Sequence, residues 1–291
     1  MFSLLDKRFT DILVQPARKR NEYSAFCSMV DSADIPEYSK IVFFGDRGYT
    51  SYNNFAHVIE RGQFFLIRCN DKRASGMMGH PVDILPAFDE DISLILTRSK
   101  AITKYSRPEL FSSYRYVYQN APMDYLNDLT TEYDLSLRLL RIQLKDGFYE
   151  NIATNLPRDE FKTEDFEMLY HLRWSEENSF RDLKYSLCLK AFHSKKYAYI
   201  VQEVWARVIL YNFSSSIIIN VTIKREDCAY EYQANYSSAL KTCRDFLRIH
   251  DGTTKINVES LIAQNIEPIR PGRTFARQHR FKLPMSFCYR Y

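Results

Sequence analysis

The chain has 291 residues, of which 45% are hydrophobic and 26% are charged, and its formal net charge is +4 at pH 7. A chain of this length can bury a large core, either as one large domain or as two smaller ones. It contains no internal repeat and no low-complexity tract, which excludes the repeat and low-complexity classes of protein.

The apolar segments argue against export and membrane insertion. Charged residues at positions 6–8 interrupt the first apolar residues, so no signal peptide is expected. Tyr197–Val221 is long and apolar, but polar side chains interrupt it, which predicts a buried core helix rather than a membrane span. These interruptions are Gln202, Glu203, Arg207 and Asn212. We therefore expect a cytoplasmic protein with no membrane partner.

The N-terminal part predicts a mixed α/β arrangement. Met1–Leu5 and Phe9–Gln15 are expected to form a hairpin of two strands, followed by a helix at Asn21–Val30. A buried strand at Ile41–Phe44, a helix at Ser51–Arg61 and a second buried strand at Phe64–Cys69 are expected next. The order strand, helix, strand in the last three indicates a parallel βαβ unit.

Residues 71–157 change in character and predict a β-rich insertion. Strand-like runs alternate there with prolines and with Gly147. The expected strands are Ile92–Thr97, Tyr114–Tyr118, Leu135–Leu144 and Phe148–Thr154. We expect this insertion to form a sheet layer beside the functional cleft rather than an independent domain.

The C-terminal part is expected to be helical. One long helix, capped near Thr163, carries the residues from Tyr170 through Lys184. Further helices are expected near Lys196–Ile219, Tyr232–Ile249 and Val258–Asn265. The last segment, Arg270–Tyr291, is basic and contains no acidic residue, which suits a polyanion or a solvated tail. Its candidate DNA-binding residues are Arg273, Arg277 and Arg280.

The most informative pattern is Tyr170, Arg173, Glu177 and Lys184. On a helix their offsets of 0, 3, 7 and 14 place them within about 60° of one another. A neighbouring apolar stripe is formed by Phe166, Leu169, Leu172, Phe180, Leu183 and Leu187. A carboxylate beside phosphate-binding groups, at the border of the core, suits metal-dependent phosphodiester chemistry. The alternative is a surface ladder of ion pairs, since Arg173 and Glu177 are four residues apart.

A second candidate, Asp46, follows the expected strand Ile41–Phe44, at the end where open α/β sheets place their sites. An aspartate before Arg47 and Gly48 is also favoured in a turn for its local hydrogen bonds. Trp174 is either a packing aromatic or a ring on which a displaced base stacks.

The spacing from Tyr170 to Lys184 and the turn Asp46–Tyr49 together resemble the signature of the insertion-sequence-four group of bacterial DDE transposases. Thr154–Leu156 before Pro157 and the arginine-rich tail are also similar to this family. The resemblance implies a ribonuclease-H-like catalytic core interrupted by a β-rich insertion. It divides the chain into core (residues 1–70 and 158–225), insertion (71–157) and a helical segment with a basic tail (226–291).

For the chemistry, the resemblance implies that Asp46 and Glu177 are catalytic and hold Mg²⁺, with Mn²⁺ as a substitute. Its implied DNA-binding residues are Tyr170, Arg173, Lys184, Trp174 and Arg47. The partners are double-stranded DNA of transposon ends and target, and a homodimer or mixed oligomer with full-length transposase, associated with the bacterial nucleoid. Glu176 falls on the apolar stripe and is an alternative to Glu177.

The family reaction uses three carboxylates, and this chain offers only two strands before the helix at Asn21–Val30. We therefore expect the first strand and its aspartate to be absent, with Asp6 and Asp11 as the nearby substitutes. The chain is then a transposase fragment that is inactive alone. The alternatives are a catalytically silent DNA-binding or oligomerising regulator, a non-functional remnant, or a stand-alone nuclease with a rebuilt third ligand.

Overall fold

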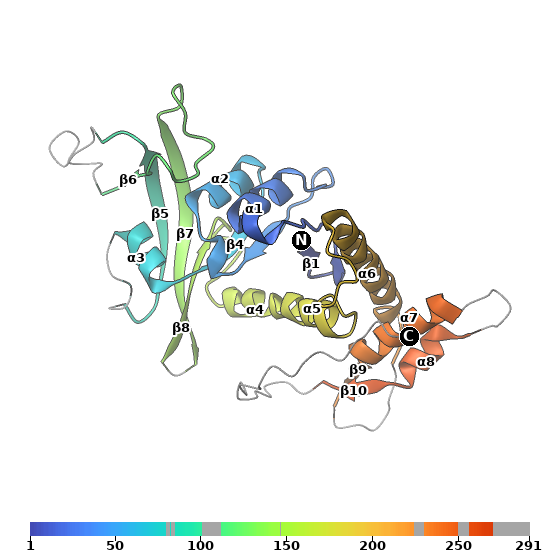
Figure 1. The fold of residues 1–291 in the computed structure, drawn as a ribbon. Helices are drawn as coiled ribbons and strands as arrows, with labels where there is room; N and C mark the ends of the chain where they lie inside the picture. Colours follow the sequence, from blue (N-terminus) through green and yellow to red (C-terminus); the bar gives the residue numbers. More distant parts are fainter. Residues whose placement is uncertain are drawn as a thin grey trace. The chain divides into compact units, whose positions relative to one another are not determined.

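A computed structural model describes residues 1–79, 82, 85–100, 112–145, 147–223, 230–249 and 256–269 (Figure 1). The chain forms two compact units. The first, here called the sheet unit, is Gln15–His171. The second, the helical unit, combines Met1–Val14 with the described residues from Leu172 onward.

The sheet unit contains a mixed sheet of six described strands in the order β3-β4-β8-β7-β5-β6. β3 (Val42–Gly45) is parallel to β4 (Phe64–Cys69), and α2 (Tyr52–Glu60) connects them, which confirms the expected βαβ unit. Upstream of β3 lie the short helix η1 (Ala17–Lys19) and α1 (Glu22–Asp31). Asn21 caps α1 by accepting a hydrogen bond from the backbone N–H of Ser24.

The β-rich segment continues this same sheet. β8 (Phe148–Thr154) is antiparallel to β4 and to β7 (Glu132–Lys145), and β7 is antiparallel to β5 (Phe88–Thr97). The short edge strand β6 (Tyr114–Tyr116) is parallel to β5. All four strands expected in this segment are therefore confirmed, although β5 and β7 are longer than predicted. The four-part division of the chain expected from the sequence stays a prediction.

One helix in this segment was not expected. α3 (Asp71–Met78) begins after Asn70, whose side chain accepts a hydrogen bond from the backbone N–H of Arg73. It ends at Gly79, which has a left-handed backbone with φ of 79°. A capping asparagine and a C-terminal glycine are the usual limits of a helix, so these two residues were the signal that the strand-based interpretation missed.

The core of the sheet unit lies on both faces of β4 because side chains alternate along a strand. On one face, Phe65 stacks on Phe55 of α2 with ring centroids 4.5 Å apart. On the other, Leu66 belongs to a buried cluster with Phe166 and Tyr170 of α4 (Asp165–Leu172). The other members of that cluster are Leu140, Ile142, Ile152 and Leu156. The two helices are thereby anchored to opposite faces of one strand.

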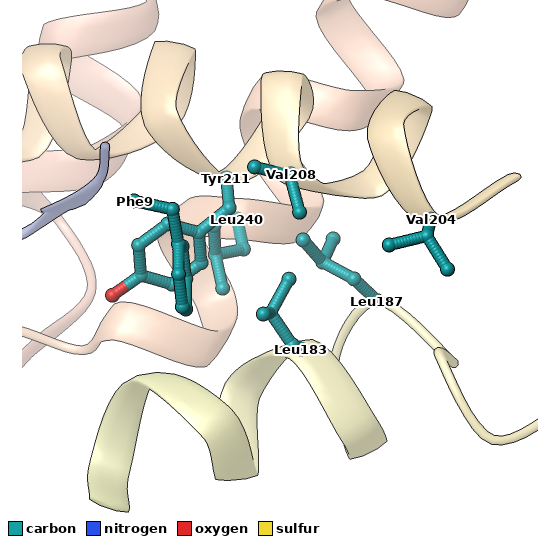
Figure 2. Close-up of a cluster of buried hydrophobic side chains, with 7 residues drawn as sticks. All are labelled: Phe9, Leu183, Leu187, Val204, Val208, Tyr211 and Leu240. Atoms are coloured by element: carbon teal, nitrogen blue, oxygen red, sulfur yellow. The ribbon is translucent and has the colours of Figure 1, made fainter. Parts of the chain in front are cut away.

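In the helical unit, a hairpin and three helices enclose a separate core (Figure 2). β1 (Phe2–Ser3) and β2 (Arg8–Phe9) form the expected antiparallel hairpin, but both strands are shorter than predicted. The helices are α5 (Trp174–Tyr185), α6 (Tyr197–Ile218) and α7 (Tyr236–Ile249). Their shared buried residues are Phe9, Leu183, Leu187, Val204, Val208, Tyr211 and Leu240.

The hairpin pairs only with itself among the described strands, whereas the resemblance implied that it belongs to the core sheet. Asn212 of α6 explains this position, since it donates to the carbonyl oxygen of Phe9 and accepts from its N–H, each at 2.8 Å. Ser215 also donates to the carbonyl oxygen of Lys7, at 2.6 Å. The edge of β2 is thereby satisfied by helix side chains instead of by another strand.

Two helical expectations need correction. The long helix expected through Lys184 is two helices, because α4 ends at Leu172 and α5 begins at Trp174, with Arg173 between them. The boundary between the two compact units also falls between residues 171 and 172. Residues near the break keep helical periodicity, so the sequence pattern could not reveal it.

The second correction concerns the start of α7. Residues 232–234, expected to be helical, form β9 (Tyr232–Ala234), which is antiparallel to β10 (Ile266–Pro268). The short helix α8 (Val258–Ala263) precedes β10. Pairing with a segment more than thirty residues away in the sequence overrides the local preference, and α7 begins only after it.

His57 of α2 lies between two carboxylates in the sheet unit. Its Nδ1 is 2.8 Å from Oδ1 of Asp31 at the end of α1, and its Nε2 is 2.9 Å from Oδ2 of Asp124, which lies between β6 and β7. Both ring nitrogens need a proton to donate to two carboxylates, so this geometry favours imidazolium. Burial alone would lower the pKa of His57, but the hydrogen bonds to both aspartates raise it above its ordinary value.

We predict that His57→Gln destabilises the chain by about 1–2 kcal/mol at pH 6 and by less at higher pH. Because the folded-state pKa is raised, the contribution is complete below the ordinary value of about 6.5 and declines as pH rises through the folded-state pKa. Urea unfolding across this range measures the effect, with the exposed His171→Gln as control. A pH-independent difference between variant and wild type would contradict the prediction.

Candidate functional site

Asp46 immediately follows β3 and begins a tight turn. Its Oδ1 accepts a hydrogen bond of 2.8 Å from the backbone N–H of Gly48, which caps the short helix η2 (Arg47–Tyr49). The local hydrogen bonding expected of a turn aspartate is therefore present. The side chain is also exposed, and within the described parts of the chain its Oδ2 has no hydrogen-bond partner. One carboxylate oxygen thus serves the turn and the other faces outward.

Two glycines allow this turn to pack closely. A Cβ atom on Gly48 would lie 3.0 Å from Oδ1 of Asp46, closer than ordinary carbon–oxygen contacts. On Gly45 it would meet Cγ1 of Ile67 at 3.1 Å and Cβ of Tyr49 at 3.3 Å. The position of the Asp46 carboxylate therefore depends on the absence of side chains at both glycines.

Arginines and acids surround the same end of the sheet. Arg47 Nη2 is 3.9 Å from Oε2 of Glu150 in β8, and the buried Glu150 also forms an ion pair with Arg68 of β4. Nearby, Arg141 Nη1 is 2.7 Å from Oδ1 of Asp71. The sequence analysis named Arg47 alone among these residues. The missed signal is a charged residue inside three of the expected strands, Phe64–Cys69, Leu135–Leu144 and Phe148–Thr154, since a buried strand carries a charge only when it is paired.

The pKa of Asp71 reflects this environment. Burial would raise it, but hydrogen bonds from Asn151 and Arg141 lower it below the ordinary value, and the charge of Arg47 acts in the same direction. Asp71 thus stays ionised and balances part of the arginine charge.

Tyr170 is placed differently from the other residues of its motif. It lies in α4, is 4% exposed and packs in the core of the sheet unit. The guanidinium carbon of Arg68 is 5.8 Å from the centroid of its ring. The expectation that one continuous helix carries Tyr170 and the other motif residues is wrong, because α4 ends at Leu172 and α5 begins at Trp174. Its phosphate-binding role stays a prediction.

The remaining motif residues belong to α5. Arg173 precedes its first residue, and Arg173 Nη1 is 2.9 Å from Oε1 of Glu177, whose side chain is 58% exposed. Lys184 is exposed and lies over the ring of Phe180, with Nζ 5.7 Å from its centroid. The ion-pair alternative therefore accounts for Arg173 and Glu177, while Lys184 contacts an aromatic ring. Trp174 is the first residue of α5, and its side chain is outside the described part of the structure.

The alternative carboxylates are less open to a ligand or lie in local turns. Glu176 is half-buried, in agreement with its position on the apolar stripe, whereas Glu177 is exposed. Asp6 lies between β1 and β2, accepts a hydrogen bond from Ser3 at 2.8 Å and forms a 3.7 Å ion pair with Arg8. Arg273, Arg277 and Arg280 lie outside the described residues.

The chemistry of Asp46 and Glu177 suits a magnesium ion, which prefers carboxylate oxygens. Within the described residues, no group of three or more His, Cys, Asp or Glu side chains is placed to hold a metal. Asp46 belongs to the sheet unit and Glu177 to the helical unit. The expected separation of roughly 4–6 Å between their nearest oxygens therefore stays a prediction.

The two functions of Asp46 can be separated by substitution. We predict that Asp46→Asn keeps the cap and unfolds like the wild type, whereas Asp46→Ala costs about 1 kcal/mol. Urea unfolding of both variants measures this. Equal stability of the alanine variant would show that the cap contributes nothing, and an unstable asparagine variant would show that the charge itself stabilises the turn.

No described helix combines the length and apolarity needed to cross a membrane. A family model described as a transposase DDE domain matches residues 1–213, which include Asp46 and the motif from Tyr170 to Lys184. None of the curated proteins matches the chain.

Proposed function

We propose that this chain, which belongs to the family of transposase DDE domains, is a member of the insertion-sequence-four group and acts on transposon-end DNA through Asp46 and Glu177. Family membership gives a transposase-type function with DNA as the substrate. The observation that carries the finer assignment is the Asp46 turn. One oxygen of its carboxylate is held by the backbone N–H of Gly48, and the side chain is exposed.

The proposed roles follow from the chemistry of each side chain. Mg²⁺ or Mn²⁺, when bound by Asp46 and Glu177, would activate the attacking water or 3′-hydroxyl and stabilise the leaving oxygen. Arg173 holds Glu177 through Oε1, which orients the carboxylate and leaves its second oxygen for a cation. Arg173 also offers a planar fork to phosphate oxygens, and Lys184 supplies a compact charge. The other residues proposed to bind DNA are Tyr170, Trp174, Arg47 and the tail arginines.

An exposed ion pair of this spacing contributes about 0.3–0.5 kcal/mol. The Arg173 side chain is only 12% exposed, however, so its removal also takes away contacts within the fold. We predict that Arg173→Ala/Lys184→Ala weakens binding to duplex DNA from the regions that flank the gene, and urea unfolding checks that the variant still folds. Loss of two phosphate contacts should lower the slope of log K against log salt by about 1.8. Fluorescence anisotropy over a salt series measures both quantities.

A matched control is Lys241→Ala/Arg248→Ala on α7, which removes the same two charges from exposed positions outside the proposed site. If the control weakens binding as much as Arg173→Ala/Lys184→Ala, net charge explains the effect. Unchanged affinity and slope in the Arg173/Lys184 variant would contradict a DNA-binding role for these two residues.

We also propose that this chain by itself does not cleave DNA. The reaction implied by the family needs three carboxylates, of which Asp46 and Glu177 account for two. In the part of the chain that the structure describes, no group of three His, Cys, Asp or Glu side chains is placed to hold a metal. Without a third ligand, a metal at this site would neither activate the attacking oxygen nor neutralise the leaving oxygen effectively, and small misplacements of catalytic groups cost orders of magnitude in rate.

Incubation of the purified chain with labelled duplex in Mg²⁺ or Mn²⁺ tests this, with Asp46→Ala as control. We expect no product. Nicking that depends on metal and disappears in the control would refute the proposal and implicate Asp6 or Asp11 as the third ligand.

The second candidate function is a catalytically silent regulator that forms mixed oligomers with full-length transposase. An exposed apolar stripe on α6 favours it, where Trp205, Ile209 and Phe213 are 40%, 64% and 38% exposed at four-residue spacing. These three side chains are uncharged, so two protein chains that pack through this stripe do not bring like charges together.

A further inference from the structure

We propose that the end of α5, the α5–α6 connection and the first turn of α6 bind a DNA strand with unpaired bases. This surface, residues 180–199, is here called the aromatic–lysine surface, and it lies wholly within the helical unit (Figure 1). The inference rests on the proposed function in taking DNA as the substrate. It extends DNA binding from Lys184, the last motif residue, to side chains beyond the motif, and it adds the form of DNA that this surface accepts.

Exposed aromatic rings and lysines alternate along this surface. Tyr185, Tyr197 and Tyr199 are 58%, 52% and 50% exposed, although large rings are normally covered in a folded protein. Exposed lysines lie among them at positions 184, 190 and 196, and no Asp or Glu occurs from Leu183 to Gln202. Asp182 at the start of the surface is buried, so its exposed charges are positive and complementary to a polyanion.

Individual lysines lie directly against the rings. Lys190 Nζ donates a 2.9 Å hydrogen bond to the hydroxyl of Tyr185 and lies 4.2 Å from the centroid of its ring. Lys196 Nζ is 5.9 Å from the ring centroid of Tyr199. This spacing brings a flat face for a base next to a charge for the adjoining phosphate.

The connection that carries these side chains is held in one shape by buried polar contacts. Arg207 of α6 donates hydrogen bonds of 3.0 Å to the carbonyl oxygens of Leu187 and Ala191. Glu203 accepts from the backbone N–H of His193 at 2.9 Å and forms an ion pair with Arg207. Burial would raise the pKa of Glu203, but these hydrogen bonds lower it, so the carboxylate stays charged.

Because Glu203 and Arg207 satisfy the backbone of the connection, the tyrosines are not needed to close it. Tyr197 is the partial exception, since its hydroxyl donates to the carbonyl oxygen of Val14 at 2.7 Å. A pre-formed surface binds without the cost of ordering a loop. Tyr185 and Tyr199 are therefore available to a ligand in the conformation they already have.

Two physical arguments favour unpaired DNA over other partners. Bases in a duplex are stacked on each other, so an exposed ring can stack only on a base that is splayed out or single-stranded. Lysine is depleted in protein–protein interfaces, where its charge must be desolvated, whereas phosphate contacts retain it at the rim of a groove.

The test is fluorescence anisotropy of the full chain with labelled oligo-dT, which has no base pairing, and with a duplex of the same length. We expect Tyr185→Ala/Tyr199→Ala to weaken oligo-dT binding by about tenfold and duplex binding by much less. Lys190→Gln/Lys196→Gln should lower the salt slope on oligo-dT by about 1.4. Tyr197 is left unchanged because its hydroxyl bonds to Val14.

The control is Tyr38→Ala/Lys241→Gln, which removes one exposed ring and one exposed lysine elsewhere, Tyr38 being 95% exposed. Thermal unfolding checks that all variants fold. Oligo-dT affinity equal to that of the wild type in both surface variants would overturn this inference alone. Equal losses of affinity for oligo-dT and for duplex in the tyrosine variant would overturn the preference of this surface for unpaired bases. A wild-type chain that binds neither probe would contradict the proposed function as well.

Discussion

The sheet unit depends on β4 and on its pairing with strands on both sides. β4 is parallel to β3 and antiparallel to β8, so it joins the βαβ unit to the strands that follow it in the sequence. Phe65, Leu66 and Ile67 are at most 1% exposed, and burial of each such side chain stabilises the fold by about 1.5–3 kcal/mol. Through β4, the Asp46 turn is attached to the largest core of the unit.

The buried charged residues of this sheet, Arg138, Arg141 and Glu150, each form an ion pair, and the pairs of Arg141 and Glu150 lie at the end that carries Asp46. Arg68 and Glu150 lie on the neighbouring strands β4 and β8, and Arg47 extends their network to the turn. A buried carboxylate that loses its arginine is costly, so these residues hold one another in place. The same network keeps positive charge close to a carboxylate that is proposed to bind metal.

In the helical unit, polar residues of α6 have an equivalent role. Asn212 holds the hairpin, while Glu203 and Arg207 hold the connection to α5. The sequence reveals these residues only as interruptions of an apolar stretch. In the structure each of them satisfies backbone groups that no strand or helix reaches, which is the reason that a core helix tolerates them.

Local pattern determined much of this protein. The bounds of β4 and β8 match the predicted strands, and α1, α2 and α6 agree with prediction to within one residue at each end. The turn at Asp46 could be predicted because an aspartate that follows a buried strand is a local feature of the sequence. The motif residues of α5 could be found because their spacing is local as well. Strand alternation, helical periodicity and capping residues act over a few neighbours and are therefore visible in the sequence.

Tertiary structure decided the rest. The antiparallel pairing of β4 with β8, the separate sheet of the hairpin and the pairing of β9 with β10 join segments that are distant in the sequence. The break at Arg173 and the burial of Tyr170 depend on which unit each helix packs against, although periodicity is the same on both sides of the break. Helical periodicity predicts which residues of a helix are buried. It does not predict which other part of the chain buries them.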